Sequence, residues 1–255
     1  MSKDTQHPRI LLAGCGYTGE RCAEFFCTDG WDVTALVSSD ASAKRLEGKP
    51  YPVFAADAAD PDRLRAMSDK TGRPDVLIHC LSGHGGRDAA AYRVTYVETL
   101  RSLLDIFSPR FTVFTGSTSV YPQNDGSCVT EDSPVGGTPT GDVLLEAERL
   151  ALESRGAVVR LGGIYGPGRA RFIEAVLSGE PLTQGAPDAF INLIHRDDAA
   201  RALFHVGSER LPGIFNAVDD TPSRRADLAA AIAATFNRPV PPIPDTPPTG
   251  KKVSW

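Results

Sequence analysis

The sequence predicts an α/β protein with a doubly wound parallel sheet, and three observations support this fold class. An apolar run at residues 9–13 breaks on glycines spaced as G-x-G-x-x-G, a pattern typical of a strand that turns into a helix. Short apolar runs then alternate with segments of helical spacing, which implies right-handed crossovers between parallel strands. Residues 76–78 are apolar at every position, as expected for a strand that helices cover on both faces.

The expected elements follow in order along the chain. The first helix ends at Asp29-Gly30, and Pro61 marks the first turn of the third helix. The expected strands are residues 9–13, 31–37, 53–57, 75–80, 111–115, 157–161, 190–194 and 213–218. The expected helices are residues 20–28, 41–47, 61–70, 89–107, 142–154, 197–206 and 224–235. Residues 121–140 are rich in Pro, Gly, Ser and Asp and are expected to form a long loop, while repeated prolines after Arg238 favour an extended tail.

Composition excludes several classes of function. The chain has 255 residues and a net charge of -5, so it lacks the basic surface that nucleic-acid binding requires. No apolar run approaches the ~20 residues of a membrane helix, and the polar first eight residues lack a signal-peptide core. Five cysteines form no C-x-x-C pair, which disfavours both metal and disulfide sites. We therefore expect a cytoplasmic protein without a metal site, a membrane segment or a nucleic-acid partner.

The glycine segment predicts a dinucleotide-binding loop. The first glycine permits the tight turn, the second lets a pyrophosphate approach the backbone, and the third lets helix and strand pack closely. The phosphates would meet free N–H groups at the start of the helix. The loop residues expected to bind a cofactor are Gly14, Gly16, Tyr17, Thr18 and Gly19. The alternative is a glycine-rich turn that binds no ligand.

The end of the second expected strand bears on the choice of cofactor. NAD-preferring sites place a carboxylate there for the ribose 2′-hydroxyl, but this sequence has Val37 followed by Ser38 and Ser39. Without that carboxylate a 2′-phosphate meets no repulsion, and the two serines can donate to it. NADP is therefore favoured over NAD. The basic residues near enough to assist are Arg21, Lys44 and Arg45, and for each the alternative is ordinary solvated helix surface.

Several separated segments together resemble the extended short-chain dehydrogenase/reductase superfamily, of the NAD(P)-dependent epimerase/dehydratase type. The segments are the opening glycines, Asp57, residues 75–82, T-G-S-T-S-V-Y at 115–121, R-L-G-G-I-Y-G-P-G-R at 160–169, and I-H-R-D-D at 194–198. The resemblance runs from about Ile10 to Thr235. It implies a Rossmann fold with a small, interleaved C-terminal substrate lobe. We expect one NAD(P)-binding domain over residues 1–255, with lobe segments at about 163–212 and 238–255, a small-molecule substrate, and a homodimer formed through the two long helices.

The resemblance also assigns roles to individual residues. It implies that Asp57 binds the adenine amine and that Leu81 and Ser82 line the ribose and nicotinamide side, with Gly163 as a further cofactor contact. The residues expected near the substrate are His84, in the glycine-rich loop after the fourth strand, Tyr165, Arg169 and His195. The alternative is an exposed loop histidine for His84 and a loop cap for Arg169. For His195, which matches the histidine of the family's I-H-x-D-D segment, the alternative is a structural role at the start of the substrate lobe.

The catalytic residues implied by the resemblance are only partly present. Ser117 and Ser119 match the family's Ser or Thr that orients the substrate oxygen. The register of the next helix puts Thr140 and Leu144 where the family has the Tyr and Lys of Y-x-x-x-K. A Thr hydroxyl without a neighbouring cation is a poor acid near neutral pH. Tyr121 is then the candidate proton donor.

Three hypotheses remain open. The first is an atypical oxidoreductase or epimerase-like enzyme that uses NADP(H) on a small polar carbonyl or hydroxyl compound. The second is a catalytically inactive NADP-binding sensor or scaffold. The third is a nucleotide-sugar epimerase or dehydratase, although residues 191–193 supply no Arg for a diphosphate.

Overall fold

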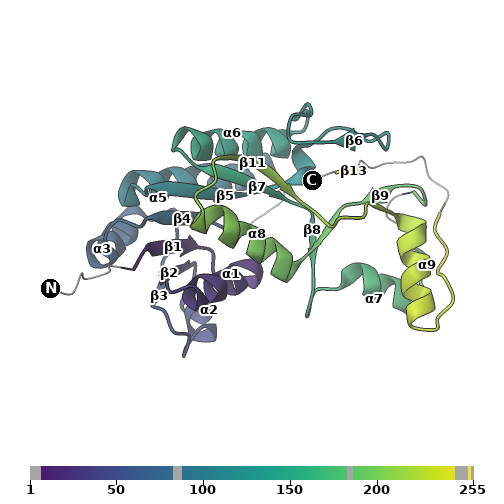
Figure 1. Ribbon diagram of the computed structural model, residues 1–255, viewed down its shortest axis with the longest axis horizontal. Coiled ribbons are helices and arrows are strands. Elements are labelled where there is room, and N and C mark those ends of the chain that lie inside the picture. The colour runs from purple at the N-terminus through teal and green to yellow at the C-terminus, as the bar shows by residue number, and fades with distance from the viewer. Residues whose placement is uncertain (1–6, 83–87, 183–185, 245–251, 254–255) are drawn as a thin grey trace.

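A seven-stranded parallel sheet forms the centre of the molecule (Figure 1). The computed structural model describes residues 7–82, 88–182, 186–244 and 252–253. The sheet has the strand order β11-β7-β5-β4-β1-β2-β3. Its strands are β1 (Arg9–Ala13), β2 (Asp32–Val37), β3 (Val53–Ala55), β4 (Val76–His79), β5 (Phe111–Ser117), β7 (Ala157–Leu161) and β11 (Gly213–Ala217). The predicted α/β fold with a doubly wound parallel sheet is confirmed.

Helices cover both faces of this sheet (Figure 1). One face carries α1 (Tyr17–Thr28), α2 (Asp40–Arg45) and α8 (Arg196–Ser208), and the other carries α3 (Pro61–Thr71), α5 (Thr99–Phe107) and α6 (Pro139–Glu153). Each face therefore has its own apolar core, centred on residues such as Phe26 and Phe107. Of the helices within the described ranges, none is long and apolar enough to cross a membrane.

The strand order places a crevice at one edge of the sheet. The connections run in one direction from β1 through β2 to β3 and in the other from β4 through β5 to β7. Strands β1 and β4, which pair as Ile10 with Val76 and Ala13 with His79, therefore flank the point where the direction reverses. In doubly wound sheets, ligands bind outside the carboxyl ends of the strands at this point.

The helix predicted over residues 89–107 is interrupted. It consists of α4 (Ala89–Tyr92), a π-helical stretch η1 (Arg93–Glu98) and α5. At its end the Thr99 N–H bonds to the Val94 carbonyl, five residues back. The stretch thus holds one residue more per turn than an α-helix, which a hydrophobic pattern averaged over a window does not reveal.

The segment predicted as a long loop contains short regular pieces. After β5 comes a 3₁₀ turn, η2 (Thr118–Val120), and β6 (Cys128–Val129) pairs in parallel with β13 (Lys252–Val253). The next helix, α6, begins at Pro139, three residues earlier than expected, because the Thr138 hydroxyl caps it by accepting from the Gly141 N–H at 3.1 Å.

A smaller cluster of elements lies beyond the carboxyl edge of the sheet (Figure 1). It contains β8 (Gly163–Tyr165), α7 (Arg171–Ser178), β9 (Phe190–Ile191), β10 (Leu193–His195), β12 (Ser223–Arg224) and α9 (Arg225–Thr235). Its apolar centre is formed by Val176, Leu182, Ala229 and Ala233. The strand expected at 190–194 is split at Asn192, because β9 pairs in antiparallel with β12 whereas β10 pairs in parallel with β8. Helix α7 and strand β8 were not predicted.

Candidate functional site

The loop between β1 and α1 is built by its glycines. Gly14 has a φ of +96°, and a Cβ there would lie 2.3 Å from the Cys80 carbonyl oxygen. A Cβ on Gly19 would lie 2.2 Å from the Gly14 oxygen. Gly16 differs, because a Cβ there would meet no atom within 4 Å. The first and third glycines therefore permit close packing of the chain, whereas the second presents bare backbone to open space.

The start of α1 can accept an anion. Gly16 is its N-cap residue and makes no side-chain cap hydrogen bond, whereas Ser39 caps α2 and Asp60 caps α3. Uncapped N–H groups and the helix dipole both favour a phosphate there. Together with the open space at Gly16, this geometry fits the pyrophosphate of a dinucleotide.

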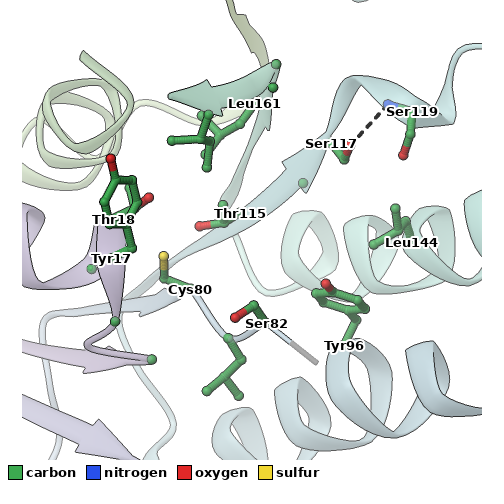
Figure 2. A pocket seen from close by; sticks show the side chains of 18 of the residues that line it. Tyr17, Thr18, Cys80, Ser82, Tyr96, Thr115, Ser117, Ser119, Leu144 and Leu161 are labelled. Atoms are coloured by element: carbon green, nitrogen blue, oxygen red, sulfur yellow. Dashed lines mark hydrogen bonds between the residues drawn. The ribbon is translucent and has the colours of Figure 1, made fainter. Parts of the chain in front are cut away.

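Two cavities open on either side of this loop. The larger, of about 630 Å³, extends past the ends of β2 and β3, and we call it the adenosine-side cavity. The smaller, of about 340 Å³, extends past the ends of β4 and β5, and we call it the reaction cavity (Figure 2). The residues that line both are Gly14, Gly16, Tyr17, Cys80, Leu81 and Ser82. The two cavities therefore form one groove across the glycine loop.

The adenosine-side cavity contains several of the predicted cofactor residues. It is lined by Val37, Ser38 and Asp57. Ser39 is not among the described lining residues, because its hydroxyl accepts from the Ser42 N–H at 3.3 Å as the cap of α2. Asp57 also accepts from the Ala59 N–H at 2.9 Å. Its side chain therefore stabilises a turn and is at the same time exposed at the cavity.

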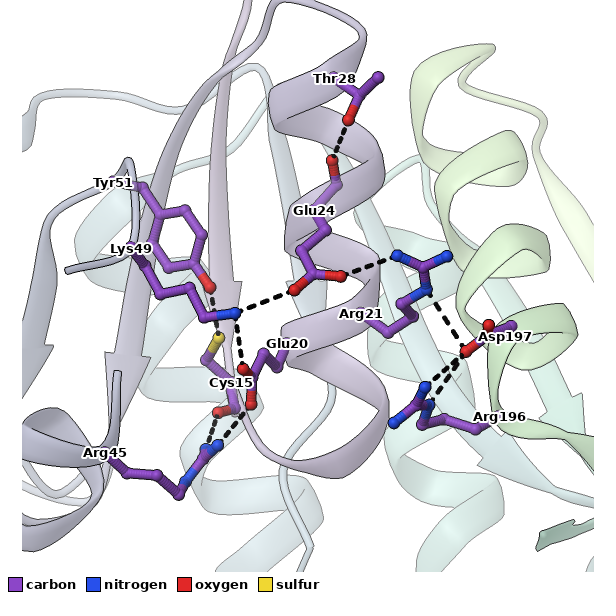
Figure 3. Close-up of polar contacts among 10 residues, drawn as sticks. All are labelled: Cys15, Glu20, Arg21, Glu24, Thr28, Arg45, Lys49, Tyr51, Arg196 and Asp197. Atoms are coloured by element: carbon purple, nitrogen blue, oxygen red, sulfur yellow. Dashed lines mark hydrogen bonds and ion pairs between the residues drawn. The ribbon is translucent and has the colours of Figure 1, made fainter. Parts of the chain in front are cut away.

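Of the three basic candidates, Arg45 is the one among the described lining residues of this cavity. The Arg45 guanidinium donates to the Cys15 carbonyl at 2.9 Å and forms an ion pair with Glu20 (Figure 3). Lys49 lies 2.9 Å from Glu20 as well, and these two cations hold the pKa of that carboxyl below its usual range against the opposing effect of burial. Arg21 instead pairs with Glu24 and Asp197 away from the cavity.

The reaction cavity holds the predicted serines. Ser117 and Ser119 both line it, and the Ser119 N–H donates to the Ser117 hydroxyl oxygen at 3.1 Å (Figure 2). In this bond the Ser117 oxygen is the acceptor, so the bond does not use the hydrogen of the Ser117 hydroxyl. That hydrogen can be donated to another acceptor. Leu144 lines the same cavity at 3% exposure, and Arg169 is the one cationic side chain among its described lining residues.

Tyr121 lies elsewhere, in a buried polar network. Its hydroxyl accepts from Arg160 at 2.8 Å and donates to the Asn216 side-chain oxygen at 2.8 Å. Arg160 in turn donates to both oxygens of Glu148, at 3.0 and 2.7 Å. Tyr121 is 2% exposed and is not among the described lining residues of the reaction cavity. The structure thus does not bring it together with Ser117 and Ser119.

The other predicted substrate residues that the structure describes lie around Gly166. Tyr17 donates to the Pro167 carbonyl at 3.1 Å and lies 5.6 Å from the Arg169 guanidinium. Tyr165 and His195 pack edge to face at 5.4 Å, and the His195 ring accepts from the Asp197 N–H as the cap of α8. Neither Tyr165 nor His195 is among the described lining residues of the two cavities. His84 lies outside the described residues.

Sequence reasoning did not single out several residues of the reaction cavity. They are Cys80, Tyr92, Tyr96, Thr115, Leu161 and Gly162. Burial raises the pKa of the Cys80 thiol to about 11, so it is a neutral wall of the cavity. Tyr92 and Tyr96 stand four residues apart and read as the apolar face of a helix, which is why the pattern alone does not mark them. Gly163, predicted as a cofactor contact, also lines this cavity.

A third hollow, of about 390 Å³, continues from Ser117 and Ser119 towards the small cluster of elements. Phe190 and Asn192 line it together with Gly163. These residues come from the split strand, so the irregularity at Asn192 places an amide and an aromatic ring next to the serines. The hollow gives a substrate room beyond the reaction cavity.

The chain is similar to known proteins in sequence and in fold. The sequence profile of the NAD dependent epimerase/dehydratase family matches residues 10–217. An NAD-dependent epimerase/dehydratase-type protein from Methylobacillus flagellatus has a structure with a TM-score of 0.79 at 30% identity, over 98% of this chain and 89% of that one. No protein among the curated sequences matches the chain.

More distant structures share the fold. UDP-glucuronic acid 4-epimerase from Bacillus cereus, in complex with NAD, has a TM-score of 0.76 at 18% identity, over 96% of this chain and 89% of that one. WbmG from Bordetella bronchiseptica, in complex with NAD and UDP, has a TM-score of 0.79 at 18% identity, over 100% of this chain and 87% of that one.

Proposed function

The chain belongs to the NAD dependent epimerase/dehydratase family, and on this premise we propose that it binds NAD(P)(H) and acts as an oxidoreductase or epimerase-like enzyme on a small polar carbonyl or hydroxyl substrate. One observation carries the proposal. The Ser117 and Ser119 hydroxyls line the same cavity as the bare backbone of Gly16. A dinucleotide bound along the groove and a substrate oxygen bound by the two serines would therefore lie next to each other.

The residues that would hold the dinucleotide follow from the groove. The α1 N-terminus and Gly16 would receive the pyrophosphate, and Asp57 would lie beside the adenine. Leu81 and Ser82, which line both cavities, would flank the ribose and nicotinamide. When bound, the cofactor supplies or accepts a hydride.

We propose NADP as the preferred cofactor. Val37 supplies no carboxylate at the end of β2, and Ser38 and Arg45 line the cavity where a 2′-phosphate would lie. Arg45 is held there by its bond to the Cys15 carbonyl, so it can meet a phosphate without first being ordered.

The serines would stabilise charge on the substrate oxygen. Ser117 accepts from the Ser119 backbone and can donate its own hydrogen to a carbonyl oxygen. Negative charge develops on that oxygen as the carbonyl carbon gains a hydride, so the hydrogen bond strengthens in the transition state.

Turnover of the purified protein tests this proposal. NADPH consumption is followed with glyceraldehyde, methylglyoxal, pyruvate and 4-nitrobenzaldehyde as carbonyl probes. We expect turnover with at least one probe, and a kcat about 10²-fold lower for Ser117→Ala with an unchanged Kd for NADPH. Ser127→Ala, an exposed serine outside the groove, is the matched control. Full activity in Ser117→Ala would remove Ser117 from the proposed site.

A second candidate function has one observation in its favour. Leu144, aligned with the family's Lys, lines the reaction cavity as an apolar side chain. An inactive NADP-binding sensor or scaffold would show NADPH binding and no turnover with any probe.

The third candidate is a nucleotide-sugar epimerase or dehydratase. UDP-glucose added to the NAD-loaded protein tests it, because such an enzyme would form a new sugar nucleotide.

A further inference from the structure

We infer that Tyr96, carried on the π-helical stretch η1, is the catalytic residue that donates the proton to the substrate oxygen. This inference rests on the proposed function and assigns a role that neither the sequence pattern nor the family resemblance gives to this position.

Tyr96 shares the reaction cavity with the serines. It lines the cavity together with Ser117, Ser119 and Ser82, and it is half-buried. In Figure 2 its ring lies between Ser82 and Leu144 with the hydroxyl end turned towards the cavity. A phenol in this position faces the space where the serines would hold a carbonyl oxygen.

The π-helical stretch is held by a specific hydrogen-bond chain. Since the Thr99 N–H bonds to Val94, the Thr95 carbonyl loses its ordinary α-helical partner. The Thr99 hydroxyl donates to that carbonyl in its place. The buried His79 Nε2 lies 2.9 Å from the same hydroxyl and donates to it, because the Thr99 hydrogen is already used.

This chain determines where Tyr96 points. One additional residue within a turn rotates all preceding side chains relative to the following helix α5. His79 on β4 and Thr99 on α5 fix that insertion directly next to Tyr96. Such π-helical insertions occur frequently at functional sites.

The ring of Tyr96 is also held in one orientation. It packs edge to face against Tyr92 at 5.1 Å and against Phe114 at 6.2 Å. The His79 ring lies 6.4 Å away on the strand side. A proton donor held by three rings loses little freedom when substrate binds.

The proposed step balances as a carbonyl reduction. A bound reduced nicotinamide would supply the hydride for the carbonyl carbon. The O–H bond of Tyr96 would break as a new O–H bond forms on the substrate oxygen. The phenolate then takes a proton from water. The product is an alcohol and the enzyme returns to its starting state.

The test compares Tyr96→Phe with Tyr51→Phe, because Tyr51 is not among the described lining residues of either cavity. NADPH turnover is measured with the four carbonyl probes, and Kd for NADPH by titration. We expect Tyr96→Phe to lower kcat by about 10²- to 10⁴-fold with Kd unchanged, and Tyr51→Phe to stay near wild type. Wild-type turnover that persists in Tyr96→Phe would overturn the inference and leave the proposed function standing. Absence of wild-type turnover with every probe would overturn both.

A second readout does not depend on turnover. With 3-fluorotyrosine at position 96, the ¹⁹F signal is expected to shift when NADP⁺ is added, because the label would lie beside the nicotinamide. The same label at position 121, inside the Arg160 network, is expected to keep its shift. An unmoved signal at position 96 under saturating NADP⁺ would overturn the placement of this residue in the site.

Discussion

Arg45 lies at the adenosine-side cavity with its guanidinium bonded to Cys15 and Glu20. We predict that Arg45→Ala weakens NADPH binding by about 10- to 100-fold, the loss of one charged hydrogen bond, and leaves NADH binding nearly unchanged. Lys44→Ala, on the same helix but outside that cavity, is the matched control. Calorimetric titration of both nucleotides gives the ratio, and an equal loss for NADH and NADPH would argue against a 2′-phosphate at Arg45.

His79 gives the protein a pH-dependent stability. Burial lowers the pKa of His79 to about 4 from an ordinary 6.5, and among the described residues its Nδ1 has no hydrogen-bond partner. The unfolded chain therefore binds this proton at a higher pH than the folded one, so stability is lost as pH falls from 6.5 towards 4. We expect about 3 kcal/mol of that loss to disappear in His79→Gln.

Urea unfolding at several pH values checks this prediction. The exposed His205 offers the comparison, and His205→Gln is expected to keep the wild-type pH dependence. An unchanged slope in His79→Gln would show that His79 is not the group that titrates.

The residue scale also shows what the sequence alone can and cannot decide. Gly14, Gly16 and Ser117 can be picked out because they belong to motifs with short, fixed spacing, although the atom that Gly14 approaches, the Cys80 carbonyl oxygen, follows another strand. The sequence offers Arg21, Lys44 and Arg45 as equal partners for a phosphate, since only the packing of α1 and α2 decides which one faces the groove. Tyr121 shows the same difficulty, because its buried partners come from distant strands.

Among the elements, the π-helical stretch η1 leads to the most specific prediction, which concerns both stability and kcat. Thr99→Val removes the hydroxyl that satisfies the Thr95 carbonyl and accepts from His79. We expect the free energy of unfolding to fall by about 1–3 kcal/mol, because two buried polar groups lose a partner. We expect kcat to fall as well, because Tyr96 loses its fixed position.

Thr99→Ser retains the hydroxyl and is expected to restore both quantities. Thermal unfolding and NADPH turnover measured on the two variants test the coupling. Loss of stability without any change in kcat would separate the π-helical stretch from catalysis.

The elements of the sheet are more predictable than those beyond it. Strand β7 lies at residues 157–161 as expected, because a buried parallel strand is rich in apolar residues and this one is apolar apart from Arg160. Helix α7 and strand β8 are short, and their apolar side chains find partners only in segments far along the chain. The insertion in η1 is invisible for another reason, since one extra residue leaves the overall helical period almost unchanged.

At the scale of the whole molecule, topology joins these pieces into one groove. The reversal of strand order between β1 and β4 opens the crevice, the glycine loop divides it, and the carboxyl end of β5 brings Ser117 to one side. The family profile over residues 10–217 covers all three features. The central claim is that a dinucleotide lies along this groove with its pyrophosphate against Gly16.

Calorimetric titration of NADPH into the wild type, Gly16→Ala and Gly16→Val tests that claim most directly. A Cβ at Gly16 meets no protein atom within 4 Å, so Gly16→Ala is expected to unfold at the wild-type temperature. The account predicts binding by the wild type and a stepwise loss, with Kd at least about tenfold higher in Gly16→Val, which is about 1.4 kcal/mol. Equal affinity in all three proteins, or no binding by the wild type, would contradict it.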